Sequence, residues 1–193
     1  MLETKLRDGL PVQVRPLTPD DRAGLAEGYR RLSPNSRYQR FWVRDGEVIG
    51  DKMLDRLLSG DPSSHRIWAV LDPEREYTGI GAASYWRSDK NPEEAEFSCT
   101  VLDQDQGNGV GTLLLAVTWL ACLRQGINRL VGYTMPENKS VIRWLLATGA
   151  NSEWDGYQAV FSWDLNDLEK IPPTTVGIDL ADRLEEFAES ILE

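Results

Sequence analysis

The sequence has few residues of the kinds that bind metals or form disulfides. It contains one histidine, His65, and two cysteines, Cys99 and Cys122, in 193 residues. Without a C-x-x-C pair, the two cysteines are expected to stay as thiols in a reducing compartment. A zinc site built from cysteine and histidine needs about four such ligands, so we expect no metal site. His65 follows two serines and is expected in a loop.

Long hydrophobic runs and basic patches are also missing. No apolar run approaches the roughly 20 residues that span a bilayer, and residues 1–5 lack the core of a signal peptide. The net charge is -10, but residues 1–163 carry 22 acidic and 19 basic side chains, whereas residues 164–193 carry 9 and 2. A nearly neutral body without a lysine- and arginine-rich stripe does not favour nucleic acid or an anionic membrane as a partner. We therefore expect a cytoplasmic protein.

The patterns that are present indicate a single domain that mixes strands and helices. At 41% hydrophobic residues, the chain can bury a sizeable core. Apolar runs and period-two alternation predict the strands, whereas caps and helical periodicity predict the helices. The predicted strands cover residues 11–17, 66–71, 79–87, 95–102, 129–133 and 158–163, and the predicted helices cover 19–32, 36–43, 50–59, 110–125 and 138–148. This order favours a mixed sheet with helices on both faces.

The last thirty residues differ from the rest. After the predicted domain of residues 1–163, residues 164–193 form an acidic segment with a proline-containing linker at 171–175. Residues 180–192 then predict an amphipathic helix. Its apolar stripe consists of Leu180, Leu184, Phe187 and Ile191. We expect this stripe to dock on its own domain; the alternative is contact with a partner, for example a second copy in a homodimer.

A glycine-rich loop between a predicted strand and a predicted helix carries the strongest functional signal. Glycines 107, 109 and 111 remove Cβ atoms, so backbone N–H groups can converge on an anion at the positive end of the helix. This arrangement predicts a phosphate or pyrophosphate site. A dinucleotide fingerprint fails because Thr112 stands where its last glycine belongs, and a P-loop fails because no lysine follows Gly111. A plain turn is the structural alternative.

The loop matches the Gln/Arg-x-x-Gly-x-Gly/Ala pattern and resembles that of the GNAT N-acetyltransferase superfamily. A second family element, an asparagine followed eleven residues later by glycine, matches Asn138 and Gly149. The resemblance covers about residues 10–163 and implies an α/β fold of the α+β type, with a mostly antiparallel sheet of about six to seven strands. It also implies acetyl-CoA as co-substrate, with the pyrophosphate held by Gln106, Gly107, Asn108, Gly109, Val110, Gly111 and Thr112.

A narrower resemblance rests on residues 6–9, 14–17, 31–38 and 136–138. These segments look like those of the bacterial protein lysine acetyltransferases of the Pat type, whose catalytic domain is often fused to a regulatory module. This resemblance implies a lysine acceptor on a protein such as an acyl-CoA synthetase, and a catalytic domain without that module. A small primary amine is the second choice of acceptor. The competing class is a module that binds acyl-CoA without transferring the acyl group.

Transfer to an amine needs a base, because keeping a lysine of pKa near 10.4 neutral at pH 7 costs about 4.6 kcal/mol. Glu96, in Ala95-Glu96-Phe97, matches the glutamate that serves as base in the Pat-like enzymes. Strand alternation puts Glu96 on one face with Ser98 and Thr100, away from the apolar side chains. The alternative is that Glu96 belongs to a solvated acidic strand start.

The resemblance also implies roles for backbone groups. In GNAT enzymes a backbone N–H of the strand before the loop binds the thioester oxygen, which here indicates Thr100, Val101 and Leu102, with Val101 preferred. Asn138 either bonds the pantetheine arm or caps the next helix. Many members have a tyrosine as general acid where this chain has Leu145, so no acid is assigned, and Tyr133 is a weak substitute. We interpret arginines 30, 31, 37, 40 and 44 as a solvated helical face, with the 3′-phosphate or an acidic acceptor as the alternative.

Overall fold

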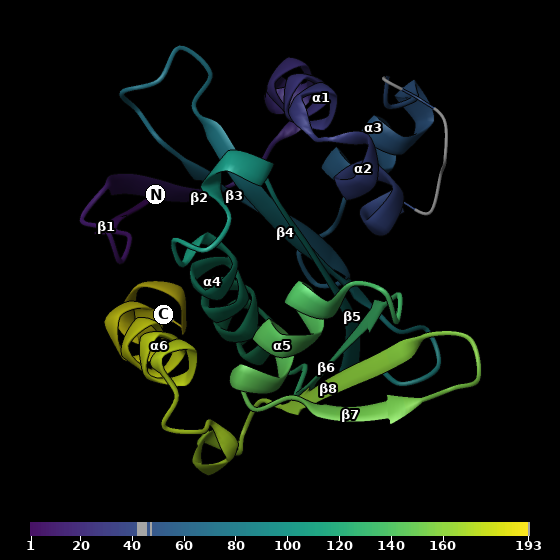
Figure 1. Ribbon diagram of the computed structural model, residues 1–193, viewed down its shortest axis with the longest axis vertical. Coiled ribbons are helices and arrows are strands. Elements are labelled where there is room, and N and C mark those ends of the chain that lie inside the picture. Colours follow the sequence, from purple (N-terminus) through teal and green to yellow (C-terminus); the bar gives the residue numbers. More distant parts are fainter. Residues whose placement is uncertain (42–45, 47, 193) are drawn as a thin grey trace.

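The computed structural model describes residues 1–41, 46 and 48–192. These residues form one eight-stranded sheet in the order β1-β2-β3-β4-β5-β6-β8-β7. All neighbouring strands are antiparallel except β5 and β6. The predicted α/β class, with a mixed, mostly antiparallel sheet between helices, is confirmed (Figure 1). The sheet has eight strands rather than the six to seven expected.

The elements follow the predicted order closely. The strands are β1 (Leu2–Lys5), β2 (Pro11–Pro16), β3 (His65–Leu71), β4 (Gly79–Arg87), β5 (Glu94–Val101), β6 (Arg129–Thr134), β7 (Asn151–Trp154) and β8 (Ala159–Asp164). The α-helices are α1 (Arg22–Arg31), α2 (Pro34–Phe41), α3 (Asp51–Leu58), α4 (Val110–Arg124), α5 (Lys139–Ala147) and α6 (Thr175–Leu192). Short 3-10 turns are η1 (Pro19–Asp21), η2 (Asp103–Asp105) and η3 (Leu168–Lys170). Residues 42–43 of one predicted helix lie outside the described residues.

The two strands that the sequence did not predict, β1 and β7, form the two edges of the sheet. β1 has four residues that alternate between half-buried and exposed, and all four residues of β7 are exposed. An edge strand that buries little apolar surface leaves almost no period-two signal in the sequence. Pairing with β2 and β8 therefore stabilises these strands more than their own side chains do.

Helix α4 lies at the centre of the main core. The sequence predicts one apolar face, but the structure buries nearly every residue from Val110 to Cys122. The reason is α6, which packs along α4 on the side away from the sheet (Figure 1). Its stripe of Leu180, Leu184, Phe187 and Ile191 belongs to the same core cluster, so this apolar surface is not free to contact a second copy. No helix of the described residues is long and apolar enough to span a membrane.

The opposite face of the sheet is covered by α1, α2 and α3, which lie together in the upper part of Figure 1. Their contact with the sheet contains a smaller buried cluster made of Tyr29, Ile49, Leu54 and Leu57. Thr18 and the 3-10 turn η1 begin this region through a capping box, as the Thr-Pro-Asp-Asp sequence indicates.

His65 lies at the start of β3, and the expectation of a loop position is wrong. Its side chain is 3% exposed. The ring nitrogens Nδ1 and Nε2 lie 2.7 Å from the carbonyl oxygen of Tyr85 and 2.9 Å from that of Leu57. The ring also stacks on Trp86 at a centroid distance of 3.5 Å. A ring with one N–H donates to one of these two carbonyls, and Trp86 covers one ring face, so a hydrogen bond and packing together hold this imidazole in the core.

Candidate active site

The site is a cleft where the parallel strands β5 and β6 separate. They pair only between residues 94–96 and 129–131, and beyond that point they diverge. The resulting cleft has a volume of about 1080 Å³ and is lined by the glycine loop, by α5 and by α2. A gap between two strands leaves their facing backbone groups available to a ligand.

The edge of β5 presents backbone N–H groups to this cleft. Leu102, just after β5, donates from its N–H to the carbonyl of Ile80 on β4, at 3.0 Å. Because N–H groups alternate sides along a strand, those of Val101 and Cys99 point the other way, toward the cleft. The Gln106 side chain donates from Nε2 to the Val101 carbonyl at 3.2 Å, which ties the loop to the strand.

Backbone conformation and close packing explain the three loop glycines. Gly107 and Gly109 adopt φ of 85° and 95°, the left-handed region that favours glycine. A Cβ on Gly111 would lie 3.3 Å from the Trp144 ring, whose Nε1 donates to Thr112 at 3.2 Å. Gly109 is the N-cap of α4 and has no side chain to offer an acceptor to the first N–H groups of the helix. Free N–H groups at a helix N-terminus, together with the helix dipole, are features that favour an anion.

Arg7 is a cleft residue that sequence analysis used only for the family resemblance. Its Nη2 donates to the Gly107 carbonyl at 2.9 Å, and its Nε lies 3.6 Å from Asp179 Oδ2 on α6. Burial raises the pKa of Asp179, and the charges of Arg183 and Arg7 oppose this effect. The tight turn at Gly9, with φ of 87°, brings this arginine beside the loop. A ligand phosphate at the loop would therefore find a cation close by.

The structure brings most of the predicted site residues together around the cleft. Those that line it are Glu96, Thr100, Val101, Gln106, Gly107, Gly109, Gly111, Thr112 and Asn138. Three others do not line it. Leu102 lines a second cavity, and Asn108 is half-buried in the loop. Val110 is buried and packs closely on Gly81 of β4, because a Cβ added to that glycine would lie 2.8 Å from the Val110 side chain. Val110 thus anchors the start of α4 to β4 by packing.

Glu96 is exposed and lines the cleft at the last residue pair of β5 and β6, Glu96 and Val131. Near it, Arg40 donates from Nη2 to Ser98 Oγ at 2.7 Å. Burial lowers the pKa of Arg40, and Cys99 and Glu96 act in the opposite direction. Tyr133 is 44% exposed in the cleft, and its pKa is raised by burial and by the charge of Glu96. The cleft therefore holds a carboxylate, a cation and a phenol close to the exposed edge of β5.

The predicted solvated arginine face is only partly present. Arg30 and Arg31 are exposed and pair with Glu27, as a solvated face requires. Arg37 donates to the Leu32 carbonyl at 2.8 Å, and Arg44 lies outside the described residues. Arg40 is different, because it is half-buried and lines the cleft. The sequence spacing of Arg37 and Arg40 does not indicate that Arg40 points into the cleft. Its direction follows from the contact of α2 with β5.

Asn138 caps α5 and also lines the cleft. Its side chain accepts from the Val141 N–H at 3.4 Å, and its exposed fraction is 7%. The structure thus contains the capping role that sequence analysis considered, while the amide remains beside the cavity. Leu145, which occupies the position of the family tyrosine, is buried in the cleft wall. Among the described residues, no group of three or more histidine, cysteine or acidic side chains converges as metal ligands.

Comparison with known proteins gives this cleft a family context. The family model for an acetyltransferase (GNAT) domain matches residues 12–151. Acetyltransferase Pat of Mycolicibacterium smegmatis is 24% identical over 149 residues, which cover 77% of this chain and 44% of that protein. Acetyltransferase PA5475 of Pseudomonas aeruginosa is 28% identical over 141 residues, 70% of this chain and 73% of that protein. This chain thus spans less than half the length of the mycobacterial relative.

A solved structure agrees with these matches. The GNAT domain of S. lividans PAT superposes with a TM-score of 0.78 at 25% identity, covering 84% of this chain and 96% of that domain. The similarity therefore extends over most of the sheet and helices described above. Because the family model matches more than half of the chain, this protein belongs to the GNAT acetyltransferase family, whose members use acetyl-CoA as the acetyl donor.

Proposed function

We propose that this protein transfers an acetyl group from acetyl-CoA to a primary amine by direct attack of the amine on the thioester. One observation carries the proposal: the glycine loop, the exposed N–H edge of β5 and the Glu96 carboxylate all line one cleft. An anion site, a strand edge and a carboxylate are the parts that acyl transfer from a CoA thioester requires.

The donor is expected to lie along β5. Its pyrophosphate binds the N–H groups of the loop and the start of α4, with Arg7 as a further cation. The pantetheine amides pair with the N–H and C=O groups of β5 as an added strand would. A cleft-facing N–H of β5, that of Cys99 or Val101, then donates to the thioester oxygen, which becomes more negative in the transition state. Asn138 lines the same path and can meet the pantetheine arm.

Glu96 is the proposed base. It accepts a proton from the acceptor ammonium, directly or through one water. The amine nitrogen then forms the amide bond while the carbon–sulfur bond breaks. The departing thiolate takes a proton from solvent, since Leu145 cannot supply one and a thiol of pKa about 8.5 is a tolerable leaving group. Tyr133 is the alternative donor.

Cys99 also lines the cleft and raises the question of a covalent acyl-cysteine route. Burial raises the pKa of this thiol to about 12, against a smaller opposing effect of Arg40. The thiolate is the nucleophilic form, and at neutral pH almost none of it is present. Direct attack by the amine is therefore favoured over transfer through Cys99.

The proposed acceptor is a lysine side chain on a cytoplasmic protein, for which an acyl-CoA synthetase is a candidate. The support is the resemblance of residues 6–9, 31–38 and 136–138 to the Pat type, together with relatives that carry the name Pat. Glu96 is an exposed residue of the cleft, so a side chain of another protein can reach it. A small amine is the second choice.

Glu96→Gln tests the proposal. We expect it to lower the transfer rate at saturating acceptor by about a hundredfold or more, the range for a lost general base, while acetyl-CoA affinity stays nearly unchanged. Release of CoA thiol across a panel of amines, lysine peptides and acyl-CoA synthetases measures the rate, and titration calorimetry measures the affinity. Glu93→Gln is the matched control, because Glu93 lies just before β5 and does not line the cleft.

Three outcomes separate the alternatives. An unchanged rate in Glu96→Gln would remove Glu96 from the mechanism. Binding of acetyl-CoA without transfer to any acceptor would favour a sensor or scaffold module. Absence of binding would contradict both the enzyme and the module.

A further inference from the structure

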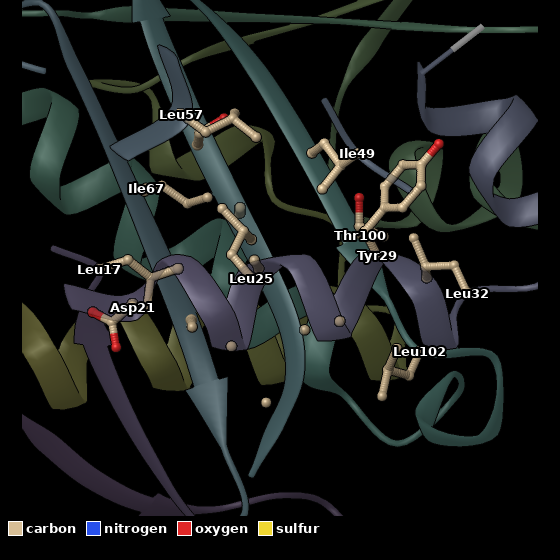
Figure 2. Close-up of a pocket in the computed structure, with 18 of the residues that line it drawn as sticks. Leu17, Asp21, Leu25, Tyr29, Leu32, Ile49, Leu57, Ile67, Thr100 and Leu102 are labelled. Carbon is tan, nitrogen blue, oxygen red and sulfur yellow. The ribbon is translucent and has the colours of Figure 1, made fainter. Parts of the chain in front are cut away.

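A second cavity, about 140 Å³ in volume, lies on the other side of β5 from α4. It is lined by residues of α1, α2 and α3 and by the faces of β3, β4 and β5 (Figure 2). Most of the surface that lines it is apolar, with side chains that include Leu17, Leu25, Leu32, Ile49, Leu57 and Ile67. Packed interiors rarely leave an apolar space of this size unfilled.

The cavity adjoins the cleft. Three residues, Arg40, Ser98 and Thr100, line both spaces. The side chains of Ser98 and Thr100 project from the face of β5 that α1 covers. The Val101 N–H lies in the plane of the sheet and points into the gap between β5 and β6. Figure 2 shows Leu17 and Asp21 on one side of the cavity and Thr100, beside Tyr29, toward the other side. An acyl group whose thioester lies along this part of β5 therefore has this space beside it.

We propose that this cavity receives the acyl chain of the donor, so that a neutral, unbranched acyl group of about four to six carbons is transferred in preference to acetyl. The inference rests on the proposed function, and it names the donor class. An apolar cavity of about 150 Å³ is large enough to bind benzene, so a space of this size suits a short aliphatic chain. The reaction stays the same: the amide bond forms, the carbon–sulfur bond breaks, and only the alkyl tail occupies the new space.

The charges around the cavity favour a neutral tail over a carboxylate. At the far end, Arg15 already forms a two-point contact with Asp21, with N–O distances of 2.6 and 2.8 Å. At the near end, Arg40 donates to Ser98, which in turn lies 3.0 Å from Ser84 Oγ. A dicarboxylic acyl group would bring its free carboxylate toward Asp21 and lose its hydration there.

The experiment compares donors of increasing length with one fixed amine acceptor. The donors are acetyl-, butyryl-, hexanoyl-, decanoyl- and succinyl-CoA, and kcat/KM is measured for each by CoA release. For the wild type we expect butyryl- or hexanoyl-CoA to exceed acetyl-CoA by about tenfold or more, with decanoyl- and succinyl-CoA below both, since one methylene in an apolar pocket changes kcat/KM by about 10- to 200-fold.

Two variants test the location. Ala82 on β4 lines the cavity beside its β5 partner Thr100, so Ala82→Leu fills the space. It should lower hexanoyl transfer by about tenfold or more and leave acetyl transfer within about twofold. Leu25→Ala, on α1, enlarges the space and should move the preference to longer chains. Thermal unfolding and the acetyl-CoA rate check that both variants fold.

Each remaining outcome counts against one claim. A wild type that transfers acetyl and rejects butyryl and hexanoyl overturns this inference and leaves the proposed function intact. Equal losses for all donors in Ala82→Leu also overturn it, because the cavity would then not select chain length. If no acyl-CoA of any length binds or reacts, the proposed function itself fails.

Discussion

The helices on the two faces of the sheet pack against it in different ways. On the α4 face, buried aliphatic and aromatic side chains from α4, α6 and the strands form one continuous core. On the α1 face, the buried cluster is small and lies next to the 140 Å³ cavity. The packed face carries the glycine loop at the start of α4, which in the proposed function has to stay fixed to hold phosphate. The looser face borders the cleft, so in the same proposal the space there would set specificity.

Polar contacts replace packing on the looser face. Arg22 of α1 pairs with Asp51 and Asp55 of α3. Ser33 and Ser36 donate to the carboxylate of Asp103, just after β5. Burial raises the pKa of Asp103, but these hydrogen bonds lower it by more, so the pKa stays below its usual value. Exposed ion pairs contribute little each, about 0–1 kcal/mol, so this face is the one expected to adapt to a ligand.

The largest expected effect comes from crowding the loop on the packed face. In Gly109→Val, the added Cβ would lie 3.1 Å from Arg7 Nε and 3.2 Å from Asp179 Oδ2, at a φ of 95° that disfavours side chains. Two lost charge-assisted hydrogen bonds at about 1.5–3 kcal/mol each should weaken acetyl-CoA binding by about a hundredfold or more. Titration calorimetry measures the affinity.

Gly126→Val is the control for Gly109→Val. Gly126 has a φ of 72° at the other end of α4, far from the cleft, so it carries a similar backbone cost. The control should lose stability and keep its affinity for acetyl-CoA. Normal affinity in Gly109→Val would mean that the loop does not bind the donor.

The second prediction compares the two faces directly. Leu180 of α6 is fully buried against α4, so Leu180→Ala should lower the free energy of unfolding by about 3–5 kcal/mol. Leu25 of α1 is half-buried beside an existing cavity, so Leu25→Ala should cost only about 1–2 kcal/mol. Urea unfolding of both variants gives the two values. Equal costs would contradict the difference in packing between the faces.

The same contrast explains what the sequence could predict. Glycines 107, 109 and 111, Asn138 and Glu96 lie within local patterns, and the structure brings them to the cleft as expected. Arg7 and Arg40 reach the cleft only through the packing of distant elements, which no local pattern records. Helix α4 looked one-sided because its second apolar neighbour, α6, lies more than fifty residues later. The second cavity depends on how α1 sits on the sheet, which is likewise a property of the assembled fold.

The smallest expected effect concerns the ion pair that closes the cavity on the looser face. Arg15 lowers the pKa of Asp21 from 3.8 to about 2 through hydrogen bonds, and Thr18 adds to this effect. Because the folded pKa is the lower one, the contribution to stability is complete above about pH 5 and is lost as the pH falls from about 4 through 2.

Asp21→Asn should therefore lower the free energy of unfolding by about 1 kcal/mol at pH 7, allowing for screening by solvent. The gap between wild type and variant should shrink toward zero at pH 2. Urea unfolding at pH 7, 4 and 2 checks both expectations, with the exposed neighbour Asp20→Asn as control. A difference that stays constant with pH would show that Asp21 acts through shape rather than charge. In that case the looser face would be held by packing after all.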